Sequence, residues 1–133
     1  MAHTELPWDA IRVASTTGDR PDGALVAIFL DAHRRALLVT PVDEGTTTID
    51  ELFLRHLEAM VADLAVPAVA FAVVRRTGIP TRRDRILWRE LSARLRSSPT
   101  ELVDVAILGE DRCWSSATRR SRALAAGHAR PVE

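Results

Sequence analysis

The chain has 133 residues, with 18 basic and 18 acidic side chains and 47% hydrophobic residues, which is the composition of one globular domain. This balance excludes a disordered segment and a uniformly basic nucleic-acid binder, and no apolar run reaches the roughly 20 residues that cross a bilayer. The first residues lack the charged and apolar regions of a signal peptide, so we expect a cytoplasmic protein. The single cysteine, Cys113, excludes an intrachain disulfide and favours a small buried hydrophobe.

The first third of the chain predicts a β-hairpin behind a short extension. Residues 1–23 are an N-terminal extension rich in turn residues, with one alternating segment at 11–15 that predicts an edge strand. The continuous apolar run at 24–30 predicts a buried strand, and a second strand is predicted at 36–42. The polar residues 31–35 between them predict the hairpin turn.

An amphipathic helix is predicted over residues 49–64, ending before Pro67. Thr48 and Glu51 have the spacing of a capping box at its start. The apolar positions recur with a period of 3.6 residues and form one stripe, namely Ile49, Leu52, Phe53, Leu57, Met60, Val61 and Leu64.

The next strand and helix form a second unit. Residues 67–74 carry no polar side chain, which is typical of a central strand covered on both faces. Thr81 and Asp84 then have the pattern of a helix start, with aspartate in place of glutamate. The helix that follows ends before Pro99.

The last predicted elements are a hairpin and a tail. Residues 102–108 and 113–116 flank a Gly-Glu-Asp-Arg turn and predict two strands, the second of them an exposed sheet edge. Residues 117–133 are rich in arginine and alanine, and they predict a frayed helix or a disordered tail. The resulting order, β-β-α-β-α-β-β, predicts an α+β fold, with a mixed sheet packed on two main helices and a three-layer-like arrangement.

Charge is unevenly distributed although its sum is zero. Residues 43–63 contain six acidic side chains and one arginine, whereas residues 75–96 contain eight arginines and two acidic side chains. One interpretation is that the two segments neutralise each other on solvated faces. The other is an anion-binding surface at the end of a central strand and the start of a helix, formed by Arg75, Arg76, Arg82, Arg83 and Arg85.

The order of elements and several short motifs resemble the JAB/MPN domain of RadC-type proteins, which has a cytidine deaminase-like architecture. The resemblance covers residues 24–78 and 81–116, within a domain that we place at 24–116 between the extension and the tail. The motifs that carry it are Ile28-Phe29-Leu30-Asp31 with Arg35, Gly45-Thr46, Val73-Val74, Gly78, Asp84, the segment from Leu102 to Gly109, and Ser115 or Ser116.

Active members of that family hold zinc through a His-x-His-Pro-Ser-Gly motif and a later aspartate. The resemblance places the two histidine positions at Val73 and Arg75, and it leaves only Asp84 in a ligand role. Valine cannot bind zinc, and an arginine is always protonated and repels a dication. Asp84 also has a structural reason to be present, because it lies at the start of a helix. We therefore expect no metal, no cofactor and no catalytic residue.

Three functions remain open at this stage. The first is a non-catalytic JAB/MPN-like module, a pseudoenzyme that binds an unidentified protein partner and no membrane. The second is binding of phosphate or nucleic acid by the five arginines, which salt would weaken. The third, a zinc-dependent JAMM-type hydrolase, needs a metal site that the sequence does not supply. A homodimer is a further expectation, through the exposed edge at 113–116 and the opposed charges.

Overall fold

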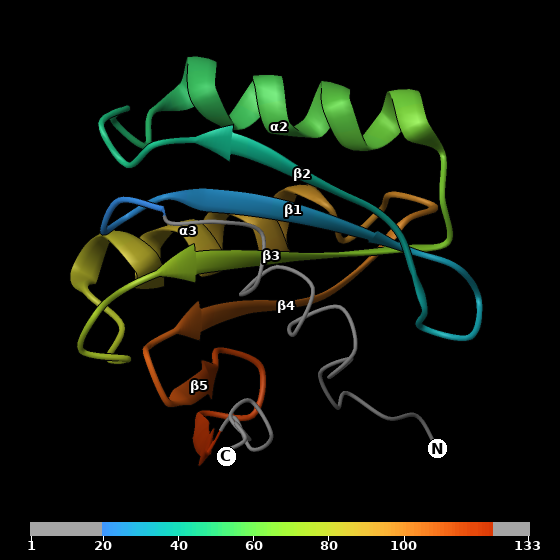
Figure 1. Ribbon diagram of the computed structural model, residues 1–133. Helices are drawn as coiled ribbons and strands as arrows, with labels where there is room; N and C mark the ends of the chain where they lie inside the picture. Colours follow the sequence, from blue (N-terminus) through green and yellow to red (C-terminus); the bar gives the residue numbers. More distant parts are fainter. Residues whose placement is uncertain (1–19, 124–133) are drawn as a thin grey trace.

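The computed structural model describes residues 20–123, which form one mixed sheet and two helices (Figure 1). In chain order the elements are β1 (Leu25–Leu30), β2 (Ala36–Asp43), α2 (Glu51–Leu64), β3 (Ala68–Val74), α3 (Arg82–Arg94), β4 (Glu101–Leu108), β5 (Arg112–Ser115) and β6 (Arg120–Ala123). The strand order across the sheet is β2-β1-β3-β4-β5-β6. Only β3 and β4 pair in parallel, through the α3 crossover. The predicted α+β class is confirmed.

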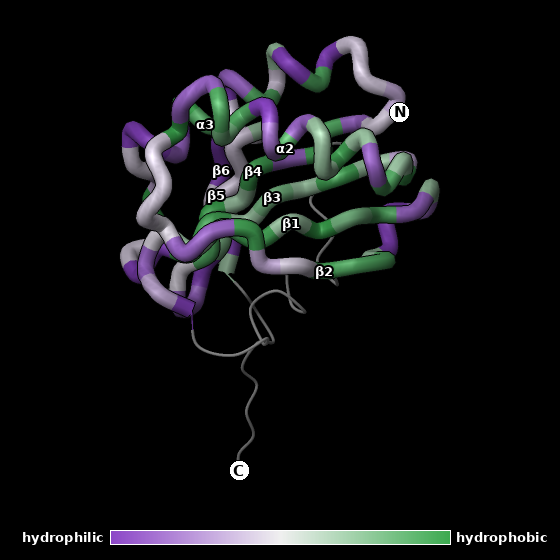
Figure 2. Tube along the Cα trace, turned by 90° about the horizontal axis from the view of Figure 1, so that it is seen from above, coloured by the Kyte–Doolittle hydropathy of each residue, from purple (hydrophilic) through white to green (hydrophobic). Residues whose placement is uncertain are grey.

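The central strands are buried on both faces, as their continuous apolar sequences predict. All six residues of β1 are buried, and so are the first six of β3. Alternate side chains point to opposite faces of the sheet, so these strands supply two separate apolar clusters. The hydropathy colouring in Figure 2 shows the two strands as apolar over most of their length.

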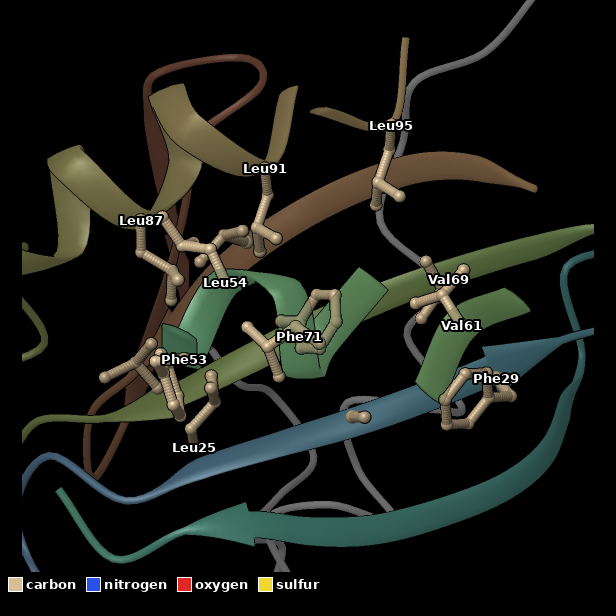
Figure 3. Packing of buried hydrophobic residues seen from close by; sticks show 14 of the residues in the cluster. Leu25, Phe29, Phe53, Leu54, Val61, Val69, Phe71, Leu87, Leu91 and Leu95 are labelled. Atoms are coloured by element: carbon tan, nitrogen blue, oxygen red, sulfur yellow. The ribbon is translucent and has the colours of Figure 1, made fainter. Parts of the chain in front are cut away.

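Both helices pack on one face of the sheet, where they bury the first of these clusters (Figures 1 and 3). Its members include Phe29 of β1 and Phe71 of β3 from the sheet, together with Leu57 of α2 and Leu91 of α3. The opposite face carries a second cluster, called here the second-face cluster, whose members are Val26, Ile28, Leu30, Ala68, Ala70, Ala72, Val103, Ala106, Leu108 and Cys113.

The predicted apolar stripe of the first helix is wrong in part. Leu52 and Leu64 are 75% and 40% exposed. The buried face is instead made by Phe53, Leu54, Leu57 and Val61. Leu54 therefore takes a place in the core that the sequence pattern had assigned to Leu52.

The two helix starts have different outcomes. The capping box of α3 is confirmed, because the Thr81 side chain accepts from the Asp84 amide and the Asp84 carboxylate accepts from the Thr81 amide. The predicted box at Thr48 is wrong. The N-cap of α2 is Asp50, whose carboxylate accepts a hydrogen bond from the Phe53 amide at 3.0 Å.

The C-terminal hairpin extends further than predicted. Residues 120–123 form β6, which pairs antiparallel with β5, so the expectation of a frayed helix or disorder fails for this part of the tail. Because β5 pairs with both β4 and β6, it is not an exposed edge. Residues 1–19 and 124–133, including the strand predicted at 11–15, lie outside the described residues. No helix within residues 20–123 has the length and hydropathy to cross a membrane.

Candidate functional site

The candidate site lies at the edge of the sheet where the parallel strands β3 and β4 end. The chain leaves β3 through Arg75, whose amide donates to the Leu108 carbonyl at the end of β4 at 2.9 Å. The first turn of α3 opens at the same edge. Strand β1 runs antiparallel to β3, so the segment before β1 also meets the site, and the Gly23 amide donates to the Val74 carbonyl.

An ion pair between Arg75 and Asp84 occupies the centre of the site. The Arg75 Nε donates to one carboxylate oxygen of Asp84 at 2.9 Å, and its Nη2 donates to the other at 2.7 Å. The Asp84 side chain is 1% exposed and the Arg75 side chain 12%. This bidentate contact is the strong geometry for a guanidinium and a carboxylate. Its hydrogen bonds raise the pKa of Arg75 above the usual range, so the guanidinium stays charged.

Asp22 joins this pair from the segment before β1. Its carboxylate accepts from the Arg76 amide at 2.9 Å and lies 3.4 Å from Nη1 of Arg75. The hydrogen bond from the Arg76 amide is the main reason that the pKa of Asp22 falls below its usual value. Asp22 therefore ties the turn before β1 to the turn after β3, a role that the sequence did not suggest.

The three positions that the resemblance assigns to a metal do not fit one. Val73 is buried in the helix-side core. The Arg75 guanidinium is paired with Asp84. Both Asp84 oxygens already accept hydrogen bonds, including one from the Thr81 amide at 2.9 Å. Over residues 20–123, no three histidine, cysteine, aspartate or glutamate side chains lie together as metal ligands. The chemistry of the site is therefore that of a closed ion pair.

The five candidate arginines separate into two groups. Arg75 is held by Asp84, and Arg83 contacts the Thr47 carbonyl and lies 3.7 Å from the Asp43 carboxylate. The side chains of the other three, Arg76, Arg82 and Arg85, are exposed, and within residues 20–123 none of them forms an ion pair. The five arginines therefore do not form one anion-binding surface, because two of them already contact carboxylates.

A hollow of about 450 Å³ lies beside the ion pair, between the starts of α2 and α3. Residues 45–49 line it from the loop before α2, and Arg82, Arg83 and Ile86 line it from α3. No acidic side chain is among these residues. The hollow thus combines threonine hydroxyls, two cations and an isoleucine from each side.

Asp43 fixes the loop that borders this hollow. Partial burial alone would raise its pKa, but hydrogen bonds from the Thr47 hydroxyl and from the amides of Gly45 and Thr47 outweigh that effect, and the pKa of Asp43 is lowered. The carboxylate is therefore ionised at neutral pH and available to Arg83. Asp43 and Thr47 were not predicted as site residues, since their contacts are made only in the folded loop.

The acidic and basic segments partly neutralise each other, as the first interpretation of the charge pattern proposes. Arg94 of α3 pairs with Glu58 of α2 at 2.9 Å and also contacts Glu51. The Arg83 contact to Asp43 joins the same two segments. Arg94 therefore links α3 to α2, and Arg83 links it to the end of β2, whereas Arg82 and Arg85 near its N-terminus are exposed.

A second buried carboxylate organises the β4–β5 hairpin. Asp104 is fully buried, and it accepts hydrogen bonds from the Ser115 hydroxyl, the Val105 amide and the Ala117 amide. Burial raises the pKa of Asp104, although these hydrogen bonds oppose the rise. This contact gives a physical reason for the aspartate and the closing serine that carry part of the family resemblance.

Comparison with known proteins gives one informative similarity. The chain is 27% identical over 104 residues to a UPF0758 protein of Nitrosomonas eutropha (strain DSM 101675 / C91 / Nm57). The match covers 77% of this chain and 46% of that protein, so the chain spans about half the length of the curated relative. No protein-family model matches the chain.

Proposed function

We propose that this chain is a RadC-like JAB/MPN domain that binds a partner and catalyses no hydrolysis. The similarity to a UPF0758 protein supports the family, because UPF0758 is the RadC-like family. The observation that carries the non-catalytic role is the Arg75–Asp84 ion pair. This ion pair occupies both oxygens of Asp84, which is the one carboxylate at the mapped metal-ligand positions.

Zinc would have to break this pair before it could bind Asp84. The metal would then have Val73 and a displaced arginine as its remaining neighbours at the mapped positions, and neither of them is a zinc ligand. A hydrolase of the JAMM type also needs a metal-bound water. The domain therefore keeps the scaffold of the family and lacks the groups that would activate water.

Zinc titration of the full chain tests this proposal. The metal-free protein competes with a chromophoric chelator for Zn²⁺, and Asp84→Asn is the matched variant. We expect the chain and the variant to give the same curve, with no stoichiometric site. One equivalent of zinc bound with a nanomolar dissociation constant, and lost in Asp84→Asn, would refute the proposal. A peptidase activity that Asp84→Asn abolishes would restore the hydrolase alternative.

Binding of an anion is the second candidate function, and the hollow beside the ion pair favours it. Arg82 and Arg83 line that hollow without an acidic neighbour in its lining, and Arg85 lies exposed on the same helix. The free amides in the first turn of α3 add positive potential at this end of the helix. The ligand class is an anion such as phosphate or the backbone of a nucleic acid.

Fluorescence anisotropy with labelled single-stranded and duplex oligonucleotides, measured over a salt series, tests this second function. Removal of two phosphate contacts in Arg82→Ala/Arg85→Ala should lower the slope of log affinity against log salt by about two. Arg89→Ala is the control, because Arg89 is exposed on the same helix further from the hollow. The absence of binding at low salt, or an affinity that salt does not change, would reject nucleic acid as the ligand.

A further inference from the structure

Strand β2 forms one edge of the sheet, because within residues 20–123 it pairs only with β1. Pro41 lies in this strand, opposite Val26 of β1. Proline has no backbone donor, so in a sheet it occupies an edge strand with its nitrogen turned away from the neighbouring strand. Backbone polar groups alternate in direction along a strand, and Val39 is two residues from Pro41 in the same regular register. The amide and the carbonyl of Val39 therefore point outward, where a further strand can bind them.

Apolar side chains surround this edge. Within residues 20–123, four of the five large hydrophobic side chains that are exposed belong to β2 or α2, namely Leu37, Leu38, Leu52 and Leu64. Leu37 and Leu38 of β2 are 58% and 45% exposed. Leu38 is paired with Phe29, a member of the helix-side cluster, so the Leu38 side chain lies on the face of the sheet that carries α2. The exposed leucines of the strand and of the helix are therefore on the same side of the sheet.

The orientation of α2 places its exposed leucines toward the β2 edge. Glu51 and Glu58 contact Arg94, so one flank of α2 faces α3. Of the two helices, α2 lies nearer the β2 end of the sheet (Figure 1). Residues four apart lie on one flank of a helix, and the flank turned away from α3 carries such a row. The row consists of Leu52, His56, Met60 and Leu64. The apolar stripe of α2 is thus wider than the sheet covers, and its uncovered part extends past the edge strand.

We propose that this edge binds a second copy of the chain, in a dimer whose two β2 strands pair antiparallel about Val39. An antiparallel pair of identical strands has a twofold axis perpendicular to the sheet, so both α2 helices lie on the same side of the extended sheet. Their outer flanks then meet, with Leu52 of each copy toward Leu64 of the other. Register shifts leave β2 regular only from Leu38 to Pro41, so the strands alone would bind weakly, and the apolar flanks supply the rest of the contact.

The charges at the two ends of β2 favour a second copy as the occupant. Arg35 precedes the strand and Glu44 follows it, and both side chains are exposed. An antiparallel pair sets each Arg35 at the same end as Glu44 of the other copy, so opposite charges meet at both ends and fix the direction of pairing. Two β6 edges would instead bring Arg120 and Arg122 of both copies together, with no acidic residue in the strand to offset them.

Sedimentation velocity of the full chain over a concentration series tests the proposal. Leu52→Glu places a charge in the contact between the helices. Ile79→Glu is the matched control, because Ile79 is 59% exposed in the loop between β3 and α3, where the adjacent Gly78 lies against the β4–β5 turn. We expect the native chain and the control to dimerise alike, and Leu52→Glu to raise the dissociation constant of the dimer at least about tenfold. Circular dichroism spectra equal to that of the native chain verify that both variants are folded.

Exchange of the end charges separates a second copy from any other occupant. Arg35→Glu should weaken the dimer, since each Glu44 then faces a second carboxylate, and Arg35→Glu/Glu44→Arg should restore it. A chain that stays monomeric at every concentration would overturn the proposal. A dimer that Leu52→Glu does not weaken, or a double variant that stays as weak as Arg35→Glu, would also overturn it, because another surface would then form the contact. These readouts do not involve the Arg75–Asp84 ion pair, so the dimer and the proposed function can fail independently.

Discussion

Replacing Arg75 by methionine removes the cation that faces Asp84 and keeps much of the apolar length of the side chain. The carboxylate, 1% exposed, then loses its two guanidinium hydrogen bonds. One of its oxygens still accepts from the Thr81 amide at 2.9 Å. An uncompensated charge thus remains in a buried position at the start of α3.

The size of the effect follows from this geometry. Breaking one side of a buried pair costs about 3–5 kcal/mol of the free energy of unfolding. The low end applies here, about 3 kcal/mol, because Asp84 keeps one amide donor and benefits from the N-terminus of α3. For a chain of 133 residues this corresponds to a decrease of about 10 °C in the melting temperature.

Urea unfolding followed by tryptophan fluorescence and circular dichroism measures this loss. Arg76→Met is the matched control, because Arg76 is the exposed neighbour of Arg75, and it should change the free energy by less than about 0.5 kcal/mol. The double variant Arg75→Met/Asp84→Asn should be more stable than Arg75→Met, since the buried charge is then gone. If Arg75→Met cost no more than Arg76→Met, the ion pair would not hold the site closed.

Three other changes test separate parts of the structure. Asp43→Asn should lower the free energy of unfolding at neutral pH. The difference from the native chain should shrink as the pH falls below 3.8, because a carboxyl whose pKa is lowered in the folded state loses its stabilising effect once it is protonated. Urea midpoints measured over a pH series test this, and a difference that does not change with pH would contradict it. Gly109→Ala should cost about 1–3 kcal/mol, since a Cβ there would lie 2.7 Å from the Gly78 Cα, and an unchanged melting temperature would contradict this contact. Ser115→Ala should cost about 1–3 kcal/mol by removing a donor from the buried Asp104 carboxylate, and a neutral result in chemical unfolding would mean that the two amides suffice.

Strong local patterns predicted most of the fold. The apolar runs of β1 and β3 are buried on both faces, as a lack of polar side chains indicates. The Thr81 to Asp84 helix start is local chemistry, and it is confirmed. At α2 the same kind of pattern was misleading, because Asp50, two residues after Thr48, caps the helix in its place. Competing cap residues two positions apart cannot be separated by spacing alone.

Other features depend on tertiary contacts and leave a weaker trace in the sequence. All four residues of β6 are exposed, so this strand shows no apolar alternation and forms through backbone pairing with β5.

Arg75 and Asp84 were each given a separate role, as anion ligand and helix cap. Their pairing follows from a short connection that returns the start of α3 to the end of β3. An arginine directly after a buried strand and an aspartate at the next helix start are the signal that would have suggested it.

Anomalous diffraction at the zinc edge, from crystals of the full chain grown with zinc, tests the central claim most directly. The account predicts that the Arg75 guanidinium remains in bidentate contact with Asp84 and that no zinc peak lies within ligand distance of that carboxylate. A zinc peak bonded to Asp84, with the Arg75 side chain turned away, would contradict it.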